Sequence, residues 1–197
     1  MKIILATNNA HKVREIKEIL GNKFDTVLTL REAGVEHETV EDGKTFYENA
    51  LKKAREITEI TGCAALADDS GLCVDILEGE PGIYSARYAA SENSGNALDA
   101  DNRKKLLDKL KNVTEVSDRT AHFVSAVVLT FPDGRVLSAK GTFSGYIAFS
   151  EKGENGFGYD SIFFVPEKNK TVAEMSEGEK NSLSHRGKAL RALEKQL

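Results

Sequence analysis

The chain has 197 residues, 40% hydrophobic and 29% charged, with a net charge of −4 and an isoelectric point of about 5.7. Residues 1–197 are predicted to form one globular domain or two closely packed lobes. No apolar run approaches the ~20 residues of a membrane span, and residues 1–6 are too short for a signal peptide, so we expect a cytoplasmic protein. The acidic balance argues weakly against a nucleic-acid partner. Cys63 and Cys73 belong to no Cys-x-x-Cys pair and are predicted to be reduced thiols rather than zinc ligands.

Strands and helices alternate in the first part of the chain. Apolar residues at helical spacing predict the first helix, and Thr45 with Glu48 predicts a capping box at the start of the second, which Gly62 would end. The predicted elements are a strand over residues 2–6, a helix over 13–20, a strand over 24–30, a helix over 45–62, and strands over 63–67 and 72–77.

The second part of the chain is dominated by a predicted hairpin. Its long strands cover residues 123–131 and 136–149, and Pro132-Asp133-Gly134 between them is typical of a turn. The other expected elements are a turn at Pro81-Gly82, a polar loop over 91–96, a helix over 102–110, a glycine-rich loop over 153–158, a strand over 162–165 and a helix over 184–196. This order predicts an α/β protein with a mixed, twisted sheet flanked by helices. Sites in such folds tend to lie in a crevice beyond the carboxyl ends of strands.

The segment Thr7-Asn8-Asn9-Ala10-His11-Lys12 joins the first strand to the first helix. Helix starts expose unpaired N–H groups and bind anions. Lys12 lies in the first turn, where the helix macrodipole disfavours a cation, so a nearby anion is indicated. Spacing alone supports phosphate binding and a plain helix cap with a solvated lysine about equally. The segment is not a Walker A loop, because it lacks the Gly-Lys-Ser/Thr ending.

Two acidic pairs stand out, Glu41 with Asp42 and Asp68 with Asp69. Adjacent carboxylates are unfavourable unless a cation lies near or one of them is protonated. Carboxylates together with phosphate oxygens suit Mg²⁺, which keeps several waters. Asp68-Asp69-Ser70-Gly71 is also good turn chemistry, and on spacing alone the turn is the favoured interpretation.

Two further groups lie near the end of the chain. Phe157-Gly158-Tyr159-Asp160 follows the glycine-rich loop, and its aromatic rings could stack on a purine, although packed aromatics at a strand edge are favoured in isolation. Lys180 and Ser184-His185-Arg186 supply donors suited to phosphate or to a base carbonyl, while a solvated helix face is equally supported.

As a set, these motifs closely resemble those of the inosine triphosphate pyrophosphatase family, also called dITP/XTP or non-standard purine NTP pyrophosphatases. The resemblance covers nearly the whole chain. It rests on Thr7-x-Asn9-x-x-Lys12, Thr45-Phe46-x-Glu48-Asn49-Ala50, Ala67-Asp68-Asp69-Ser70-Gly71, Pro81-Gly82-Ile83-Tyr84-Ser85-Ala86-Arg87, Gly156-Phe157-Gly158-Tyr159-Asp160 and Ser184-His185-Arg186-Gly187. It implies an elongated α/β fold of two lobes with the active site in the cleft between them, dependence on Mg²⁺, and a homodimer.

By position, the resemblance implies that Glu41 and Asp69 bind the metal and that Asp69 accepts a proton from the attacking water. The loop before Gly43 leaves Asp42 as an alternative to Glu41. Asn8 stands where many relatives have glycine, and since both accept a left-handed backbone we expect little change. The residues implied to hold the triphosphate are Thr7, Asn8, Asn9, Ala10, His11 and Lys12. Those implied to contact the substrate elsewhere are Ser70, Phe157, Gly158, Tyr159, Asp160, Lys180, His185 and Arg186.

The implied activity is hydrolysis of ITP, dITP or XTP to the monophosphate and pyrophosphate, which keeps deaminated purines out of DNA and RNA. Donors from Lys180, His185 or Arg186 aimed at the 6-oxo group would disfavour adenine. Three alternatives remain open: a pyrophosphohydrolase for pyrimidine or modified nucleotides, a non-catalytic nucleotide sensor, and a nucleic-acid-binding module. The sequence favours the last least, and no membrane partner is indicated.

Overall fold

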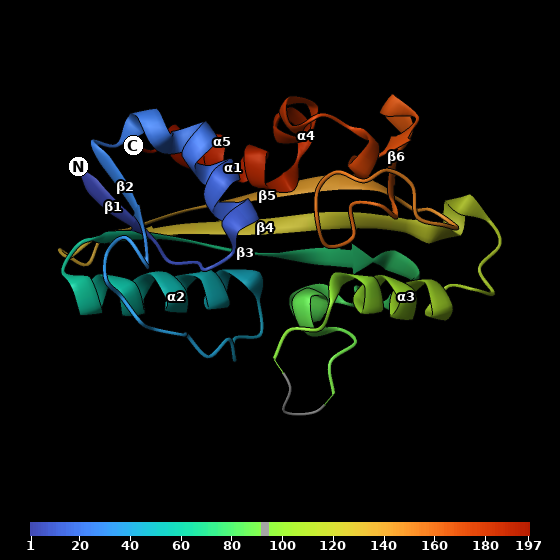
Figure 1. Ribbon diagram of the computed structural model, residues 1–197, viewed down its shortest axis with the longest axis horizontal. Helices are drawn as coiled ribbons and strands as arrows, with labels where there is room; N and C mark the ends of the chain where they lie inside the picture. Colours follow the sequence, from blue (N-terminus) through green and yellow to red (C-terminus); the bar gives the residue numbers. More distant parts are fainter. Residues whose placement is uncertain (92–94) are drawn as a thin grey trace. The chain divides into compact units, whose positions relative to one another are not determined.

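The computed structural model describes residues 1–91 and 95–197, and its strands form one seven-stranded sheet in the order β2-β1-β3-β4-β5-β6-β7 (Figure 1). Strand β1 pairs in parallel with β2 and β3, whereas β6 pairs antiparallel with β5 and β7. The predicted α/β class with a mixed sheet is therefore confirmed. The strands are β1 (Lys2–Leu5), β2 (Thr26–Thr29), β3 (Ala64–Val74), β4 (Thr120–Thr130), β5 (Val136–Ile147), β6 (Phe163–Val165) and β7 (Lys170–Thr171).

Five α-helices and six 3₁₀ helices are found in these described residues. The α-helices are α1 (Ala10–Leu20), α2 (Phe46–Thr61), α3 (Asp99–Lys109), α4 (Glu177–Leu183) and α5 (His185–Glu194). The 3₁₀ helices are η1 (Gly21–Lys23), η2 (Asp75–Leu77), η3 (Gly82–Arg87), η4 (Val116–Arg119), η5 (Pro166–Lys168) and η6 (Val172–Glu174). Part of the polar loop predicted over residues 91–96, namely residues 92–94, lies outside the described residues. No helix within 1–91 and 95–197 has both the length and the apolar character needed to cross a bilayer.

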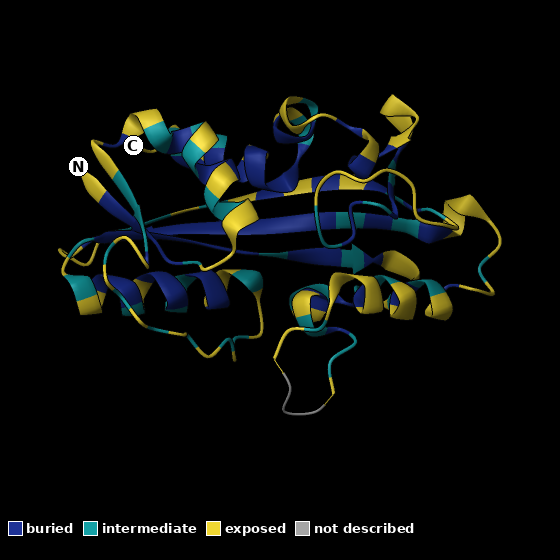
Figure 2. Cartoon of the chain, in the orientation of Figure 1, coloured by how far each residue is buried: buried dark blue, intermediate teal, exposed yellow. Residues whose placement is uncertain are grey.

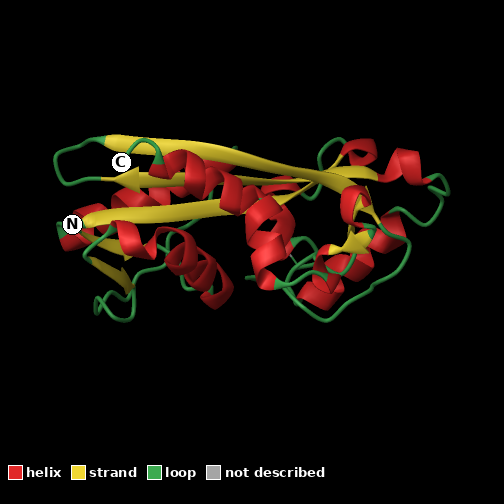
Figure 3. Ribbon diagram, turned by 90° about the horizontal axis from the view of Figure 1, so that it is seen from above, coloured by secondary structure: helices red, strands yellow, loops and turns green. Residues whose placement is uncertain are grey.

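The chain divides into two compact units. Unit 1 comprises Met1–Ser70, Ser125–Thr142 and His185–Leu197, and unit 2 comprises Gly71–Val124 and Phe143–Ser184. Each unit contains both strands and helices (Figure 3). The long strands β3, β4 and β5 contribute residues to both units, so the division cuts across single strands rather than falling in linkers.

Unit 1 is layered, with α1 and α5 on one face of its strands and α2 on the other (Figure 1). Side chains alternate between the two faces of a strand, so Ile3 packs in the core beneath α1 and α5, while Ile4 packs beneath α2. Both faces of β1 are thus buried, which explains why it reads as a continuous apolar run in the sequence. The face of α2 turned toward the strands is buried and its opposite face is exposed (Figure 2).

Helices α1 and α2 both begin with side-chain caps. The Asn9 side chain accepts hydrogen bonds from the backbone N–H groups of His11 and Lys12, which are unpaired at the start of any helix. The predicted capping box between Thr45 and Glu48 is present at the start of α2. These caps fix where α1 and α2 begin, each worth about 1 kcal/mol.

Strand β3 runs unbroken through the segment that the sequence favours as a turn. The predicted strands over residues 63–67 and 72–77 are parts of this one strand, with Asp75–Leu77 forming η2, and the turn predicted between them is wrong. Asp68-Asp69-Ser70-Gly71 lies inside the strand, and both aspartates are buried. Turn propensity is a local preference, and burial against neighbouring elements overrides it here. As a result, the acidic pair lies in the interior of the protein instead of on an exposed loop.

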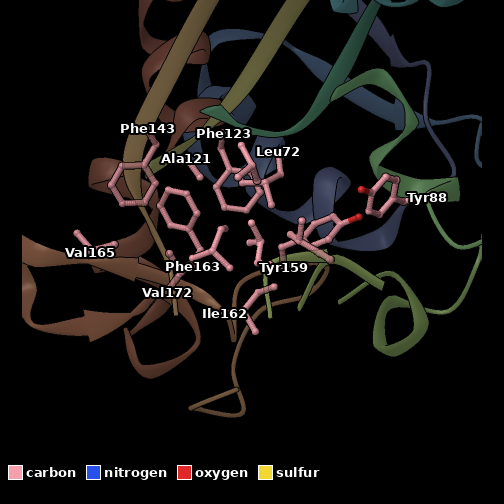
Figure 4. Packing of buried hydrophobic residues seen from close by; sticks show 14 of the residues in the cluster. Leu72, Tyr88, Ala121, Phe123, Phe143, Tyr159, Ile162, Phe163, Val165 and Val172 are labelled. Carbon is pink, nitrogen blue, oxygen red and sulfur yellow. The ribbon is translucent and has the colours of Figure 1, made fainter. Parts of the chain in front are cut away.

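Unit 2 has its own aromatic core (Figure 4). The ring of Phe163 lies 4.6 Å from that of Phe123 and 5.5 Å from that of Phe143, measured between centroids. Tyr159 packs in the same core and donates its hydroxyl hydrogen to the backbone oxygen of Ser85. Figure 1 shows α3 on one side of the unit's strands and α4 on the other.

Candidate active site

Asp68 is fully buried on β3 and surrounded by cations of unit 1. Its Oδ2 lies 2.9 Å from Lys12 Nζ and 3.1 Å from Arg186 Nη2, and its Oδ1 accepts a hydrogen bond from Ser125. Burial alone would raise the pKa of Asp68, but the charges of Arg186 and Lys12 outweigh burial and hold the pKa well below its usual range. Asp68 is therefore ionised and permanently paired.

Arg186 at the start of α5 is the buried counter-charge. Its Nη1 donates to Glu15 of α1, and its Nη2 donates to Asp68 and, over 2.8 Å, to Ser70 Oγ. The three charged side chains are all buried, and buried charges are stable only when paired. Arg186 was predicted to contact the substrate; that contact stays a prediction, and the structure shows in addition that Arg186 joins α5, α1 and β3.

Asp69 points to the opposite face of β3, toward α2. Its Oδ1 lies 3.2 Å from Lys53 Nζ, and its Oδ2 accepts a hydrogen bond of 3.2 Å from Asn49 Nδ2. Burial raises the pKa of Asp69, and the neighbouring carboxylates of Glu41 and Asp68 raise it further, against the opposing charges of Lys53 and Lys12. Asp69 is therefore a stronger proton acceptor than an ordinary aspartate.

Lys53 links Asp69 to Glu41. Its Nζ lies 2.9 Å from Glu41 Oε1 and donates a hydrogen bond of 3.1 Å to the backbone oxygen of Asp68. Burial would lower the pKa of Lys53, but Asp69 and Glu41 outweigh burial and raise the pKa above its usual value. A charged ammonium group thus lies between the two carboxylates that the resemblance assigns to the metal.

The loop between β2 and α2 carries Glu41 and is held against α2 by a hydrogen bond at Gly43. The backbone N–H of Gly43 donates to Asn49 Oδ1 over 2.8 Å, and a Cβ on Gly43 would lie only 2.6 Å from that oxygen. Asp42 instead pairs with Lys52 at the surface, its side chain 68% exposed. Glu41, rather than Asp42, is therefore the carboxylate that shares a cation with Asp69.

This donor set fits a magnesium ion. Glu41 and Asp69 already converge on one cation, the ammonium of Lys53. Over residues 1–91 and 95–197 no group of three or more His, Cys, Asp and Glu side chains gathers at metal-binding distance. Two carboxylates without further protein ligands are the set that Mg²⁺ accepts when waters and substrate phosphates complete its shell.

The start of α1 lies beside this acidic pair, with the His11 and Lys12 N–H groups capped by the Asn9 side chain. Asn8, Asn9, Ala10 and His11 are exposed, and Thr7 is half-buried and accepts a hydrogen bond of 3.2 Å from the Asn9 N–H. Lys12 points back to β3, with only 14% of its side chain exposed. An exposed helix start with a lysine turned inward is suited to binding an anion.

The predicted residues of unit 2 form a second group. Asp160 Oδ2 accepts hydrogen bonds from the Phe157 N–H over 2.9 Å and from Lys180 Nζ over 2.8 Å. Lys180 Nζ also lies 4.6 Å from the centroid of the Phe157 ring. Because Tyr159 is buried in the core, the half-buried Phe157 is the aromatic residue of this loop that can stack on a base.

The predicted site residues therefore divide between the units. Unit 1 contains Thr7, Asn8, Asn9, Ala10, His11, Lys12, Glu41, Asp69, Ser70, His185 and Arg186, and unit 2 contains Phe157, Gly158, Tyr159, Asp160 and Lys180. Sequence reasoning missed Lys53, although a signal exists: Lys53 follows Ala50 by three residues and precedes Ile57 by four, so a lysine occupies the apolar stripe of α2. It also missed Glu15, for which the sequence offers no signal.

Comparisons with known proteins are consistent across the whole chain. The model of the Ham1 family matches residues 3–196. The chain is 52% identical to the dITP/XTP pyrophosphatase of Leuconostoc mesenteroides, covering 100% of this chain and 96% of that protein. It is 50% identical to the dITP/XTP pyrophosphatase of Clostridium perfringens, covering 100% and 97%.

Solved structures agree with the sequence comparisons. The Ham1 protein of Staphylococcus aureus superposes with a TM-score of 0.85 at 42% identity, covering 99% of this chain and 97% of that one. The HAM1 protein of Coxiella burnetii superposes with a TM-score of 0.87 at 40% identity, again covering 99% and 97%.

Proposed function

The chain belongs to the Ham1 family, and from that premise we propose that it hydrolyses aberrant purine nucleoside triphosphates, namely ITP, dITP and XTP, to the monophosphate and pyrophosphate. The names of the Leuconostoc and Clostridium relatives support the substrate class. The observation that carries the proposal is the buried Asp69, a carboxylate with a raised pKa, which lies beside the ion-paired Asp68 and two lysines, Lys12 and Lys53.

We propose that Mg²⁺ is held by Glu41 and Asp69. When bound, the ion supplies positive charge to phosphate oxygens. The support for this assignment is the convergence of both carboxylates on the Lys53 ammonium, which shows that the protein places a unit of positive charge at this point.

In the proposed reaction, Asp69 orients a water molecule and accepts its proton as the water oxygen bonds to the α-phosphorus. The bond between that phosphorus and the α–β bridging oxygen breaks, and pyrophosphate leaves. The start of α1, together with Lys12, is suited to holding the departing phosphates. Most of the rate acceleration would come from positioning and electrostatics, as is usual for phosphoryl transfer.

Selectivity is proposed to depend on the base. The purine would stack on Phe157, while donors from Lys180, His185 or Arg186 would bind the 6-oxo group that adenine lacks. A buried donor left facing the 6-amino group of adenine would be unpaired, and such mismatches can discriminate by about 10⁴-fold. Which donor faces the base stays a prediction.

The experiment that tests the function is product analysis. The purified protein is incubated with Mg²⁺ and, separately, ITP, XTP, GTP, ATP or CTP, and the released pyrophosphate and orthophosphate are quantified. We expect pyrophosphate, with kcat/KM highest for ITP and XTP. Release of orthophosphate would contradict the proposed bond, preference for CTP would indicate a pyrimidine-directed enzyme, and binding of ITP without turnover would indicate a nucleotide sensor.

Three further proposals come with this function. Residues 1–197 would act as one two-lobed catalytic domain, the protein would form a homodimer, and it would work in the cytoplasm, where nucleotide pools are maintained. Light scattering of the purified protein tests the dimer, since the chain mass of 21.5 kDa would then double.

A further inference from the structure

Gly158 is held through both of its backbone polar groups by side chains of α3. Its N–H donates to Asp99 Oδ2 over 2.7 Å, and its carbonyl oxygen accepts from Arg103 Nη1 over 2.8 Å. The φ angle of Gly158 is +62°, a conformation that glycine adopts readily. The two α3 side chains hold the peptide groups on either side of this residue.

Arg103 is itself held in place. Its Nε donates to Glu151 Oε2 over 2.8 Å, and the same oxygen accepts a hydrogen bond of 2.9 Å from Ser161 Oγ. One nitrogen of the planar guanidinium thus donates to Glu151 and another donates to Gly158, which sets the orientation of the group as well as its position. We refer to Asp99, Arg103, Glu151 and Ser161 as the α3 clamp.

The α3 clamp acts on Gly158, which lies between two anchored aromatic residues. Tyr159 is fixed in the core of unit 2 through its ring and its hydroxyl group. On the other side, the Phe157 N–H donates to the Asp160 side chain, the Phe157 carbonyl oxygen accepts from the Asp160 N–H over 3.2 Å, and the Phe157 ring lies against Lys180. The peptide between Phe157 and Gly158 is thus held by Asp160 at its oxygen and by Asp99 at its N–H, so the clamp takes part in setting where the Phe157 ring points.

We propose that Asp99 and Arg103 are positioning residues for base recognition. They act through Gly158 to keep Phe157 in the orientation in which its ring can stack on the purine, and they touch neither the base nor the phosphates themselves. This inference rests on the proposed function, since it requires that the loop receives the base. It gives α3, which no motif of the resemblance includes, a part in choosing the substrate.

The test separates the base from the phosphate tail. Asp99→Ala and Arg103→Ala are compared with wild type for the KM and kcat on ITP, and for the inhibition constant of inorganic tripolyphosphate, which has no base. Because each variant loses one hydrogen bond to Gly158, we expect the KM for ITP to rise roughly five- to tenfold. The kcat and the inhibition constant of tripolyphosphate should stay within about twofold of wild type.

Matched controls come from the same helix. Asp101→Ala removes an acidic residue from the same first turn of α3, and Lys104→Ala removes an exposed cation beside Arg103, so both should leave the KM unchanged. Asp99→Asn keeps an oxygen that can accept from the Gly158 N–H and should restore the wild-type KM. Hydrogen exchange measured without nucleotide should be faster at the Gly158 amide in Asp99→Ala than in Asp99→Asn.

The outcomes distinguish the inference from the function on which it rests. If wild type releases no pyrophosphate from ITP, the proposed function is wrong. If wild type is active but both alanine variants keep its KM, or if tripolyphosphate binding weakens as much as ITP binding, the clamp does not position the base and the inference is overturned.

Discussion

Asp68 and Asp69 are adjacent on β3, yet their pKa values move in opposite directions. Successive side chains on a strand point to opposite faces, so Asp68 meets Arg186 while Asp69 meets Lys53 and Asn49. The first carboxylate is ionised and committed to a buried ion pair, and the second retains affinity for a proton. One strand thus supplies both a structural anion and the carboxylate that we propose as the base.

Replacing Asp69 tests the base directly. Asp69→Asn keeps the shape of the side chain but removes its ability to accept a proton, so we expect kcat on ITP to fall by about 10²- to 10⁴-fold. Asp42→Asn, in an exposed carboxylate of the neighbouring loop, should retain nearly full activity. A loss below about tenfold in Asp69→Asn would show that Asp69 is not the base.

Replacing Asp68 should primarily affect stability. Asp68→Asn leaves the buried Arg186 without one of its counter-charges, and breaking a buried ion pair typically costs about 3–5 kcal/mol of unfolding free energy. Urea unfolding at pH 7 measures the loss. Asp133→Asn, at an exposed position, should change the free energy by less than about 0.5 kcal/mol. Equal stability of the two variants would contradict the pairing.

The same pair predicts how stability depends on pH. The folded-state pKa of Asp68 lies below the unfolded value of about 3.9, so its contribution is fully present above that value and disappears as pH falls through the folded pKa. The difference in unfolding free energy between wild type and Asp68→Asn should therefore be constant from pH 7 to pH 5 and shrink in stronger acid. If this difference instead grows on acidification, the folded-state pKa of Asp68 is not lowered.

Lys53 offers a test of the metal proposal that does not depend on turnover. Lys53→Met removes the cation between Glu41 and Asp69, so these carboxylates repel each other and the metal-free protein should unfold at lower temperature. Added Mg²⁺ would restore the positive charge, so we expect a larger increase in Tm with Mg²⁺ for this variant than for wild type. Lys52→Met, which breaks only a surface pair with Asp42, is the control.

Gly156 should tolerate no side chain. Its φ angle is +79°, and a Cβ would lie 2.1 Å from Asp160 Oδ2, the oxygen that binds the Phe157 N–H and Lys180. Gly156→Ala should therefore displace Asp160, destabilise the protein by about 1–3 kcal/mol and raise the KM for ITP. Gly178→Ala, where a Cβ meets open space, should be neutral or slightly stabilising. Thermal unfolding and steady-state kinetics compare the two.

Local signals predicted the starts of α2 and α5 to within one residue and most strands, because caps and apolar periodicity depend on neighbouring residues. The Thr45–Glu48 capping box is one example, and α4 was missed although Ser176 and Glu179 carry the same signal. The turn predicted at Asp68-Asp69-Ser70-Gly71 failed because burial is a property of the folded chain. The polar run from Asp68 to Ser70 carries no local pattern that shows its strand covered on both faces.

The candidate site was harder to predict than the fold. Motifs identified Lys12 and Asp69, but their partners depend on long-range contacts. Glu15 and Arg186 are separated by 171 positions and still form one ion pair. Lys53 was missed because a lysine in a helix is normally solvated, and only its place on the apolar stripe of α2 distinguishes it. Sequence therefore indicates which chemistry is present, whereas geometry shows which charges neutralise one another.

The position of Arg186 in the chain has a consequence for biosynthesis. Arg186 is translated after both acidic residues that it neutralises, Glu15 and Asp68. While α5 is still inside the ribosome, the nascent chain lacks the Arg186 guanidinium that neutralises these two carboxylates. Completion of this part of the protein must therefore wait until α5 has emerged from the ribosome.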